Sequence, residues 1–176
     1  TGVLAEELFQ SLSINTNIIN QEVDGNFPNH SPDPSKEINL KQLQNQVLDT
    51  SSDIGFSYDG DGDRVTVIRD DGSILWPDQL LMIFARNILK TNQGSKIIYD
   101  VKCSKHLENI IRENGGHPIL SRTGHSYIKN LMTKENAILV GEMSGHIFFT
   151  DKWEGFDDGI YASIRLLEIL SSAKKK

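Results

Sequence analysis

The chain has 176 residues, of which 38% are hydrophobic and 24% charged, and its formal net charge is −6 at pH 7. This composition fits a globular protein of one or two domains and argues against general nucleic-acid binding, which favours a basic surface. We find no apolar run of membrane-spanning length and no signal peptide, so we expect no membrane partner and a cytoplasmic location. The single cysteine, Cys103, excludes an internal disulfide and fits a reducing compartment.

The first part of the chain combines helix and strand patterns with a proline-rich loop. In chain order we expect a helix at 3–12, a strand at 17–23, a loop at 24–34, a helix at 38–48, strands at 54–58 and 65–68, and a turn at 70–72. The prolines of the loop cannot continue a regular element. The two later strands are rich in β-branched and aromatic side chains.

From residue 76 on, helices and strands alternate. We expect helices at 80–89, 104–114, 126–133 and 157–171, and strands at 96–100, 117–121, 137–140 and 147–150. Such alternation predicts an α/β layered fold. We place a domain boundary near residue 73, giving domains of residues 1–73 and 74–176, and expect Asp157 or Asp158 to cap the last helix.

A short loop between two expected strands carries an unusual charge pattern. Residues 58–64 read Y-D-G-D-G-D-R, with Asp59, Asp61 and Asp63 separated only by glycines. Two like charges ~4 Å apart repel by about 4 kcal/mol near a protein surface unless a cation lies between them. Carboxylate oxygens suit magnesium, calcium or manganese, so we expect a metal site. The alternative is a solvated acidic turn, because Asp-Gly is a common turn pair.

The loop does not match a calcium-binding EF-hand. Counted from Asp59, the sixth position is Arg64 instead of glycine and the twelfth is Asp70 instead of glutamate. The flanking segments are strands, whereas an EF-hand has helices. A guanidinium next to a metal is useful when an anion joins the site, and its fork matches phosphate geometry. Metal, arginine and phosphate together indicate phosphoryl-transfer chemistry.

Three polar loops follow three apolar strands in the second domain. They carry an ammonium, imidazoles, a carboxylate and a hydroxyl: Lys102, His125, Glu142, Ser144 and His146. Strand ends of α/β folds commonly hold ligands, and this set suits a polyhydroxylated ligand and proton transfer. Each residue also has a structural interpretation. Lys102 alone would be an exposed side chain, His125 could cap a helix, and Glu142 could pair with His146.

Several motifs together resemble the α-D-phosphohexomutase family. Y-D-G-D-G-D-R resembles its magnesium loop and G-E-M-S-G-H its sugar-binding loop, the latter in the form typical of the bacterial phosphomannomutase/phosphoglucomutase branch. The resemblance continues through E-V-D-G-N-F-P-N-H-S-P-D-P, D-V-K-C-S, R-T-G-H-S and W-E-G-F-D-D-G-I-Y. It covers almost the whole chain, in the family's order and spacing. It implies two layered α/β domains with mixed sheets, the second and third of the family's four.

The resemblance implies a role for each matching residue. Asp59, Asp61 and Asp63 match magnesium ligands, and Arg64 matches the arginine beside a catalytic phosphoserine. Lys102 and His125 match catalytic groups near the reacting hydroxyl and phosphate. Glu142, Ser144 and His146 match the substrate-binding loop. The family's enzymes move a phosphate between the 1- and 6-positions of a hexose such as mannose or glucose, through a phosphoserine and a bisphosphate intermediate.

One departure from the family pattern limits this interpretation. The T-x-S-H-N-P-like motif that carries the phosphoserine in domain 1 is absent, and so is the phosphate-binding domain 4. We therefore expect a segment of a longer mutase that works with domains 1 and 4 of the same polypeptide and is inactive alone. Two alternatives remain: a magnesium and sugar-phosphate binding module without turnover, and a metal-dependent phosphatase.

Overall fold

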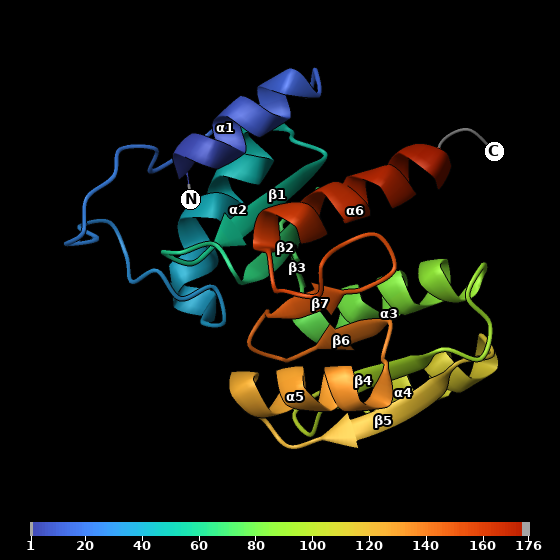
Figure 1. The fold of residues 1–176 in the computed structure, drawn as a ribbon. Coiled ribbons are helices and arrows are strands. Elements are labelled where there is room, and N and C mark those ends of the chain that lie inside the picture. The colour runs from blue at the N-terminus through green and yellow to red at the C-terminus, as the bar shows by residue number, and fades with distance from the viewer. Residues whose placement is uncertain (1, 174–176) are drawn as a thin grey trace.

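The computed structural model describes residues 2–173 and contains two α/β units (Figure 1). The elements of the first unit are α1 (Gly2–Ser11), α2 (Glu37–Thr50), β1 (Ile54–Tyr58), β2 (Val65–Arg69) and β3 (Ile74–Leu75). Those of the second are α3 (Pro77–Leu89), β4 (Lys96–Asp100), α4 (His106–Glu113), β5 (His117–Ser121), α5 (His125–Glu135), β6 (Leu139–Gly141), β7 (Ile147–Phe149) and α6 (Gly159–Ala173). The expected α/β fold class is confirmed.

The strand expected at 17–23 is wrong, because residues 12–36 contain only turns, bends and irregular chain. Asn20, in the middle of the expected strand, has a φ of +54°, which lies in the left-handed region and not in the β region. Its side chain instead donates to Gln42 of α2 at 2.9 Å. A strand also needs a neighbouring strand for its backbone groups, and the first sheet of the described chain ends at β1 and β3.

The first unit is a three-stranded antiparallel sheet in the order β1-β2-β3. The side chains of β2 alternate, so that Val67 enters the main core while Ile68 packs against α2. Helix α2 lies close to β1 at Gly55, where a Cβ would stand 2.7 Å from a methyl group of Val47. The sheet is therefore covered on both faces.

The second unit has a mixed sheet in the order β5-β4-β6-β7, in which only β7 is antiparallel to its neighbour. Ile97 and Tyr99 of β4 face the core formed with α3, α4 and α6, whereas Ile98 faces α5. The main core also includes Val65 and Val67 of β2. Apolar packing is thus continuous across the boundary expected near residue 73. None of the helices within residues 2–173 combines the length and apolar character needed to cross a bilayer.

Three backbone contacts join the units next to the polar loops. The amide of Val65 donates to the carbonyl of Gly145 at 3.2 Å, and Arg64 and His146 form an isolated antiparallel bridge. The amide of Gly159, at the start of α6, donates to the carbonyl of Gly62 at 2.8 Å. The acidic β1–β2 loop therefore lies against the β6–β7 loop and the start of α6.

Candidate functional site

The three aspartates of the β1–β2 loop converge. Asp59, Asp61 and Asp63 each offer one carboxylate oxygen, and these oxygens lie within 4.8 Å of one another. Asp59 is buried, Asp63 is half-buried and Asp61 is exposed, so the group opens toward solvent on one side. The three carboxylates therefore lie close enough together to be candidates for one metal site.

The spacing of these oxygens fits a magnesium ion. At Mg–O distances of about 2.0–2.1 Å, adjacent ligands of an octahedron are about 2.9 Å apart and opposite ligands about 4.1 Å. The observed separations of at most 4.8 Å need only a small closure to reach that range. Three protein oxygens leave positions for water or phosphate oxygens, which is the usual arrangement for Mg²⁺.

Arg64 is held at the edge of the loop by two carboxylates. Its Nε donates to Asp59 Oδ2 at 2.6 Å, and its Nη1 donates to Asp33 Oδ1 at 3.2 Å. Burial alone would raise the pKa of Asp59, but its hydrogen bonds from Arg64 outweigh burial and the net pKa is lowered. Burial likewise opposes the charge of Arg64, and the neighbouring carboxylates nevertheless raise its pKa. Both groups remain ionised, as cation and anion.

Asp63 is the least compensated carboxylate of the loop. Its Oδ1 is buried and has no hydrogen-bond partner within the described chain, although Nδ1 of His146 lies 3.6 Å away and Nε of Arg64 lies 4.0 Å away. Burial raises the pKa of Asp63 to about 6, and the nearby charges of Asp59 and Asp157 add to the shift. A buried carboxylate oxygen without a hydrogen bond is well suited to accept a metal ion.

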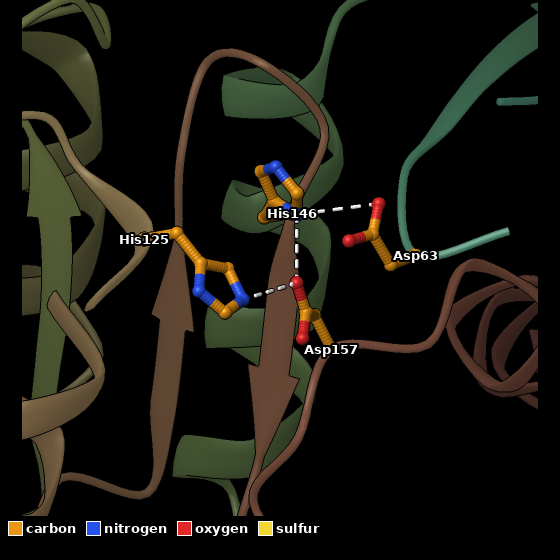
Figure 2. A group of neighbouring side chains, drawn as sticks. All are labelled: Asp63, His125, His146 and Asp157. Atoms are coloured by element: carbon orange, nitrogen blue, oxygen red, sulfur yellow. Dashed lines mark hydrogen bonds and ion pairs between the residues drawn. The ribbon is translucent and has the colours of Figure 1, made fainter. Parts of the chain in front are cut away.

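A second cluster lies beside the acidic loop and joins it to the second unit. Figure 2 shows Asp63, His125, His146 and Asp157 facing one another, from the β1–β2 loop, the start of α5, the start of β7 and the segment before α6. Asp157 Oδ2 accepts from His125 Nε2 at 2.9 Å and from His146 Nδ1 at 2.7 Å. The two imidazole rings are 5.3 Å apart in an edge-to-face arrangement.

Hydrogen bonds within this cluster fix its charges. Burial raises the pKa of Asp157, but hydrogen bonds from His146 and His125 more than offset it, and the net pKa is lowered. Burial lowers the pKa of His146, but its bond to Asp157 and the charge of Asp63 raise it overall. With Asp157 ionised, both imidazoles donate to it, so His125 carries its bonded proton on Nε2 and His146 on Nδ1.

The β6–β7 loop is anchored by two buried carboxylates. Glu142 is buried, and its Oε1 accepts from the amide of Gly124 at 3.0 Å. Asp100, at the end of β4, accepts from the amides of Lys102 and Met143 at 3.0 and 3.3 Å. The loops after β4, β5 and β6 are thereby tied to one another. Glu142 and His146 pair through their backbones, since the amide of Glu142 donates to the carbonyl of His146 at 2.9 Å, and the charge of Glu142 also contributes to the raised pKa of His146.

The remaining candidates lie on these tied loops. The side chain of Lys102 is exposed in the turn after β4, and Ser144 is half-buried between β6 and β7. His125 is the first residue of α5, whose N-cap is Gly124 with no side-chain cap, so His125 is not a cap. Figure 2 shows its ring directed at Asp157.

Sequence reasoning did not select two residues that the structure brings to the site. Asp33, in the proline-rich loop, pairs with Arg64, and Asp157 joins the two histidines. The cap of α6 is Asp158, which accepts from the amide of Tyr161 at 2.9 Å, and this leaves Asp157 free of that task. The adjacent acidic residues in W-E-G-F-D-D-G could have indicated this role for Asp157, because one helix start needs only one capping side chain and the second aspartate is left for another contact.

Comparison with known proteins gives a consistent assignment. Residues 1–72 match the model "Phosphoglucomutase/phosphomannomutase, alpha/beta/alpha domain II", and residues 76–176 match domain III of the same family. The chain is 54% identical to a phosphomannomutase/phosphoglucomutase of Pseudomonas syringae over 97% of its own length and 37% of that protein. It therefore spans little more than a third of this curated relative.

Solved structures agree with the sequence matches. A phosphoglucomutase/phosphomannomutase family protein of Burkholderia thailandensis superposes with a TM-score of 0.95 at 48% identity, over 97% of this chain and 37% of that one. An N-acetylphosphoglucosamine mutase of Aspergillus fumigatus, solved with GlcNAc-6P and magnesium, superposes with a TM-score of 0.72 at 14% identity over 98% of this chain and 44% of that one. The second likeness concerns the fold alone.

Proposed function

The chain belongs to the phosphoglucomutase/phosphomannomutase family, and from this premise we propose that it forms the metal-binding and sugar-binding part of a hexose-phosphate mutase. The reaction would interconvert the 1- and 6-phosphates of mannose or glucose. The observation that carries the proposal is the junction between the two loops, where the amide of Val65 bonds the carbonyl of Gly145 at 3.2 Å. This bond sets the three converging carboxylates against the loop of Glu142, Ser144 and His146.

In this proposal Asp59, Asp61 and Asp63 hold Mg²⁺. When bound, the ion supplies electrostatic stabilisation to a phosphoryl group that carries negative charge. The support is the convergence of the three oxygens within 4.8 Å and the buried, unpartnered Oδ1 of Asp63. The magnesium bound to the Aspergillus fumigatus mutase of the same fold is in keeping with this assignment.

Arg64 is proposed to contact the phosphate of the substrate. Two of its nitrogens are held by Asp59 and Asp33, which fixes the direction of the guanidinium plane. A fixed guanidinium presents its remaining N–H groups to phosphate oxygens without a large loss of side-chain entropy. Arg64 would thus orient the phosphoryl group while the carboxylates beside it hold the metal.

Glu142, Ser144 and His146 are proposed to bind the hydroxyl groups of the sugar. Glu142 is anchored through Oε1 to Gly124, and its second oxygen remains available as an acceptor on the same loop. Ser144 adds a hydroxyl that can donate or accept. A loop held by Asp100 and Gly145 can present these groups with little rearrangement.

Lys102 and His125 are proposed to act near the hydroxyl that gains or loses the phosphate. The Nε2 of His125 bonds Asp157, which orients its ring, and an oriented imidazole can move a proton at a substrate oxygen. Lys102 projects from the turn after β4, where an ammonium can neutralise a phosphate. The nucleophile that carries the phosphoryl group in this scheme lies outside the 176 residues.

A transplant tests the proposal directly. The matching segment of the Pseudomonas syringae relative would be replaced by this chain, and conversion of mannose 1-phosphate to mannose 6-phosphate would be followed by phosphorus NMR. We expect interconversion without net release of inorganic phosphate, and loss of activity in an Asp61→Asn version. A His106→Gln version, altered at the exposed first residue of α4, is the matched control.

The same experiment distinguishes the two alternatives. Release of inorganic phosphate would indicate a phosphatase. Saturable binding of Mg²⁺ and mannose 6-phosphate to the isolated chain, with a folded but inactive transplant, would indicate a binding module without turnover. If the transplant does not fold, binding of Mg²⁺ and of the hexose phosphate to the isolated chain, measured by calorimetry, still tests the site. Absence of both would contradict the proposal.

A further inference from the structure

We propose that Asp63, His125, His146 and Asp157 form a second metal site, which takes a borderline transition-metal ion such as Zn²⁺ and shares Asp63 with the magnesium loop. The four residues each offer one ligand atom, and these atoms lie within 4.8 Å of one another. This inference does not depend on the mutase reaction, because it concerns metal binding alone.

The distances within the cluster suit a four-coordinate ion. Zinc bonds of about 2.0–2.1 Å to nitrogen and oxygen place the ligands of a tetrahedron about 3.3–3.4 Å apart. In the cluster, Asp157 Oδ2 lies 2.9 Å from His125 Nε2 and 2.7 Å from His146 Nδ1, and His146 Nδ1 lies 3.6 Å from Asp63 Oδ1. On binding, the ion would displace the protons that His125 Nε2 and His146 Nδ1 donate to Asp157, and each neutral ring would carry its proton on the other nitrogen. Small outward shifts of the two bonded nitrogens would open space for the ion.

The ligand types distinguish this site from the neighbouring one. Two imidazoles and two carboxylates favour zinc and similar ions, whereas the three carboxylates of the β1–β2 loop favour magnesium. Two carboxylates also neutralise a divalent ion. In addition, Oδ1 of Asp63 is buried without a hydrogen-bond partner in the described chain and faces His146, so one ligand atom is already desolvated.

The backbone around the cluster is held in place. His146 lies next to β7 and bridges to Arg64, Asp157 bridges to Phe148, and the ring of His125 packs 5.5 Å from that of Phe148. His125 has a side chain that is 42% exposed, which leaves an entry path for an ion from solvent. Figure 2 shows both rings joined to Asp157, with the carboxylate of Asp63 beside the ring of His146.

Because Asp63 belongs to both sites, the two metals should compete. An ion held by the histidines would draw Asp63 away from Asp59 and Asp61, and a magnesium ion in the loop would remove the fourth ligand of the histidine site. Zinc would also occupy both imidazoles. A mutase built on this chain would therefore be inhibited by zinc and protected by excess magnesium.

Cobalt(II) provides a direct readout, because a tetrahedral cobalt site absorbs visible light far more strongly than an octahedral one. The 176-residue chain would be titrated with CoCl₂. We expect a strong visible band that ZnCl₂ abolishes and that excess MgCl₂ weakens. His125→Gln should weaken cobalt binding about tenfold or more. His106→Gln is the matched control, since His106 is likewise the first, exposed residue of its helix, α4.

Three results would overturn the inference. They are a weak band typical of octahedral cobalt, a strong band that His125→Gln leaves unchanged, and a band that disappears in Asp61→Asn, which would place the ion in the acidic loop. A measurement on the unmodified chain guards against a variant that fails to fold. Among the five histidines, zinc should shift the imidazole NMR signals of His125 and His146 and leave those of His30, His106 and His117 unchanged, and any other pattern contradicts the site.

Discussion

The acidic β1–β2 loop and the histidine cluster share Asp63 but are built in different ways. The loop is local, since its three carboxylates lie within five consecutive residues and the amides of Gly62 and Arg64 bond Asp59. The cluster is assembled, since its four side chains come from separate loops and helix starts. A local site depends on its own short sequence, whereas an assembled site depends on the packing of the whole unit around it.

The largest effect on stability is expected when the ion pair that holds the segment before Asp157 is broken. Arg165 of α6 is buried and forms two hydrogen bonds of 2.8 Å with Asp151, in the segment that leads to Asp157. Asp151→Ala would remove both of these bonds, and the buried guanidinium would retain the hydroxyl of Tyr161 at 3.0 Å and the exposed carboxylate of Glu168 at 3.7 Å. We expect the free energy of unfolding, measured in urea, to fall by about 3–5 kcal/mol. Asp49→Ala, at an exposed position of α2, should change it by less than about 0.5 kcal/mol.

A smaller effect is expected at Gly159, where the two regions meet. A Cβ at this position would stand 2.7 Å from the carbonyl oxygen of Arg64 and 2.9 Å from that of Gly62. Both are backbone atoms, so the acidic loop itself must move. Gly159→Ala should cost about 1–3 kcal/mol in urea unfolding and should also weaken magnesium binding. Gly25→Ala, with open space around it, is the control, and unchanged magnesium affinity would show that the loop is independent of α6.

The next effect concerns metal binding by the local loop. Asp61 is the exposed ligand of the three, so Asp61→Asn should leave stability unchanged. It should weaken magnesium binding about tenfold, or about 1.4 kcal/mol, as judged by calorimetry. Asp70→Asn, in the exposed turn after β2, is matched in chemistry and should have no effect. Equal affinity of Asp61→Asn and the unmodified chain would argue for a solvated acidic turn.

The smallest effect concerns Cys103, which lies in the turn after β4 in the second unit. Burial raises the pKa of its thiol well above the usual range, and the charge of Asp100 adds to the shift. A raised pKa keeps the thiol protonated, so alkylation by iodoacetamide should be slow and should not accelerate between pH 7 and 9. In urea the thiol should regain a pKa near ~8.5 and react faster as the pH rises. Because the pKa of the thiol is higher in the folded state than in the unfolded state, the free energy of unfolding should decrease as the pH rises above ~8.5.

Local patterns of the sequence predicted most of the fold and the acidic loop. The helices and strands from β1 onward follow from apolar periodicity, except for the two-residue strand β3, which was not predicted. The convergence of Asp59, Asp61 and Asp63 follows from their alternation with glycines. The prediction of a strand at 17–23 is wrong because the β-branched pair Ile18 and Ile19 favours a strand, although no strand of the described chain pairs with this segment. The β-propensity of a segment depends on its own residues, whereas a strand in a sheet also requires a neighbouring strand to pair with.

The cluster around Asp157 could not be predicted in the same way. Nothing local relates His125 to Asp157, which lie 32 positions apart in the chain. Their contact requires α5 to start at the edge of β5 and the segment before α6 to return beside β7. Asp33 is a similar case, since its pairing with Arg64 depends on the path of an irregular loop. Such residues are found only when tertiary packing is known.

The amide contacts between the two units limit how the site can open. Any hinge motion between the units would have to break the bond from Val65 to Gly145 and the bond from Gly159 to Gly62 together. The acidic loop and the polar loops should therefore travel as one rigid body. A sugar phosphate would bind to a preformed surface, and the movement that admits and releases it would occur at a different hinge.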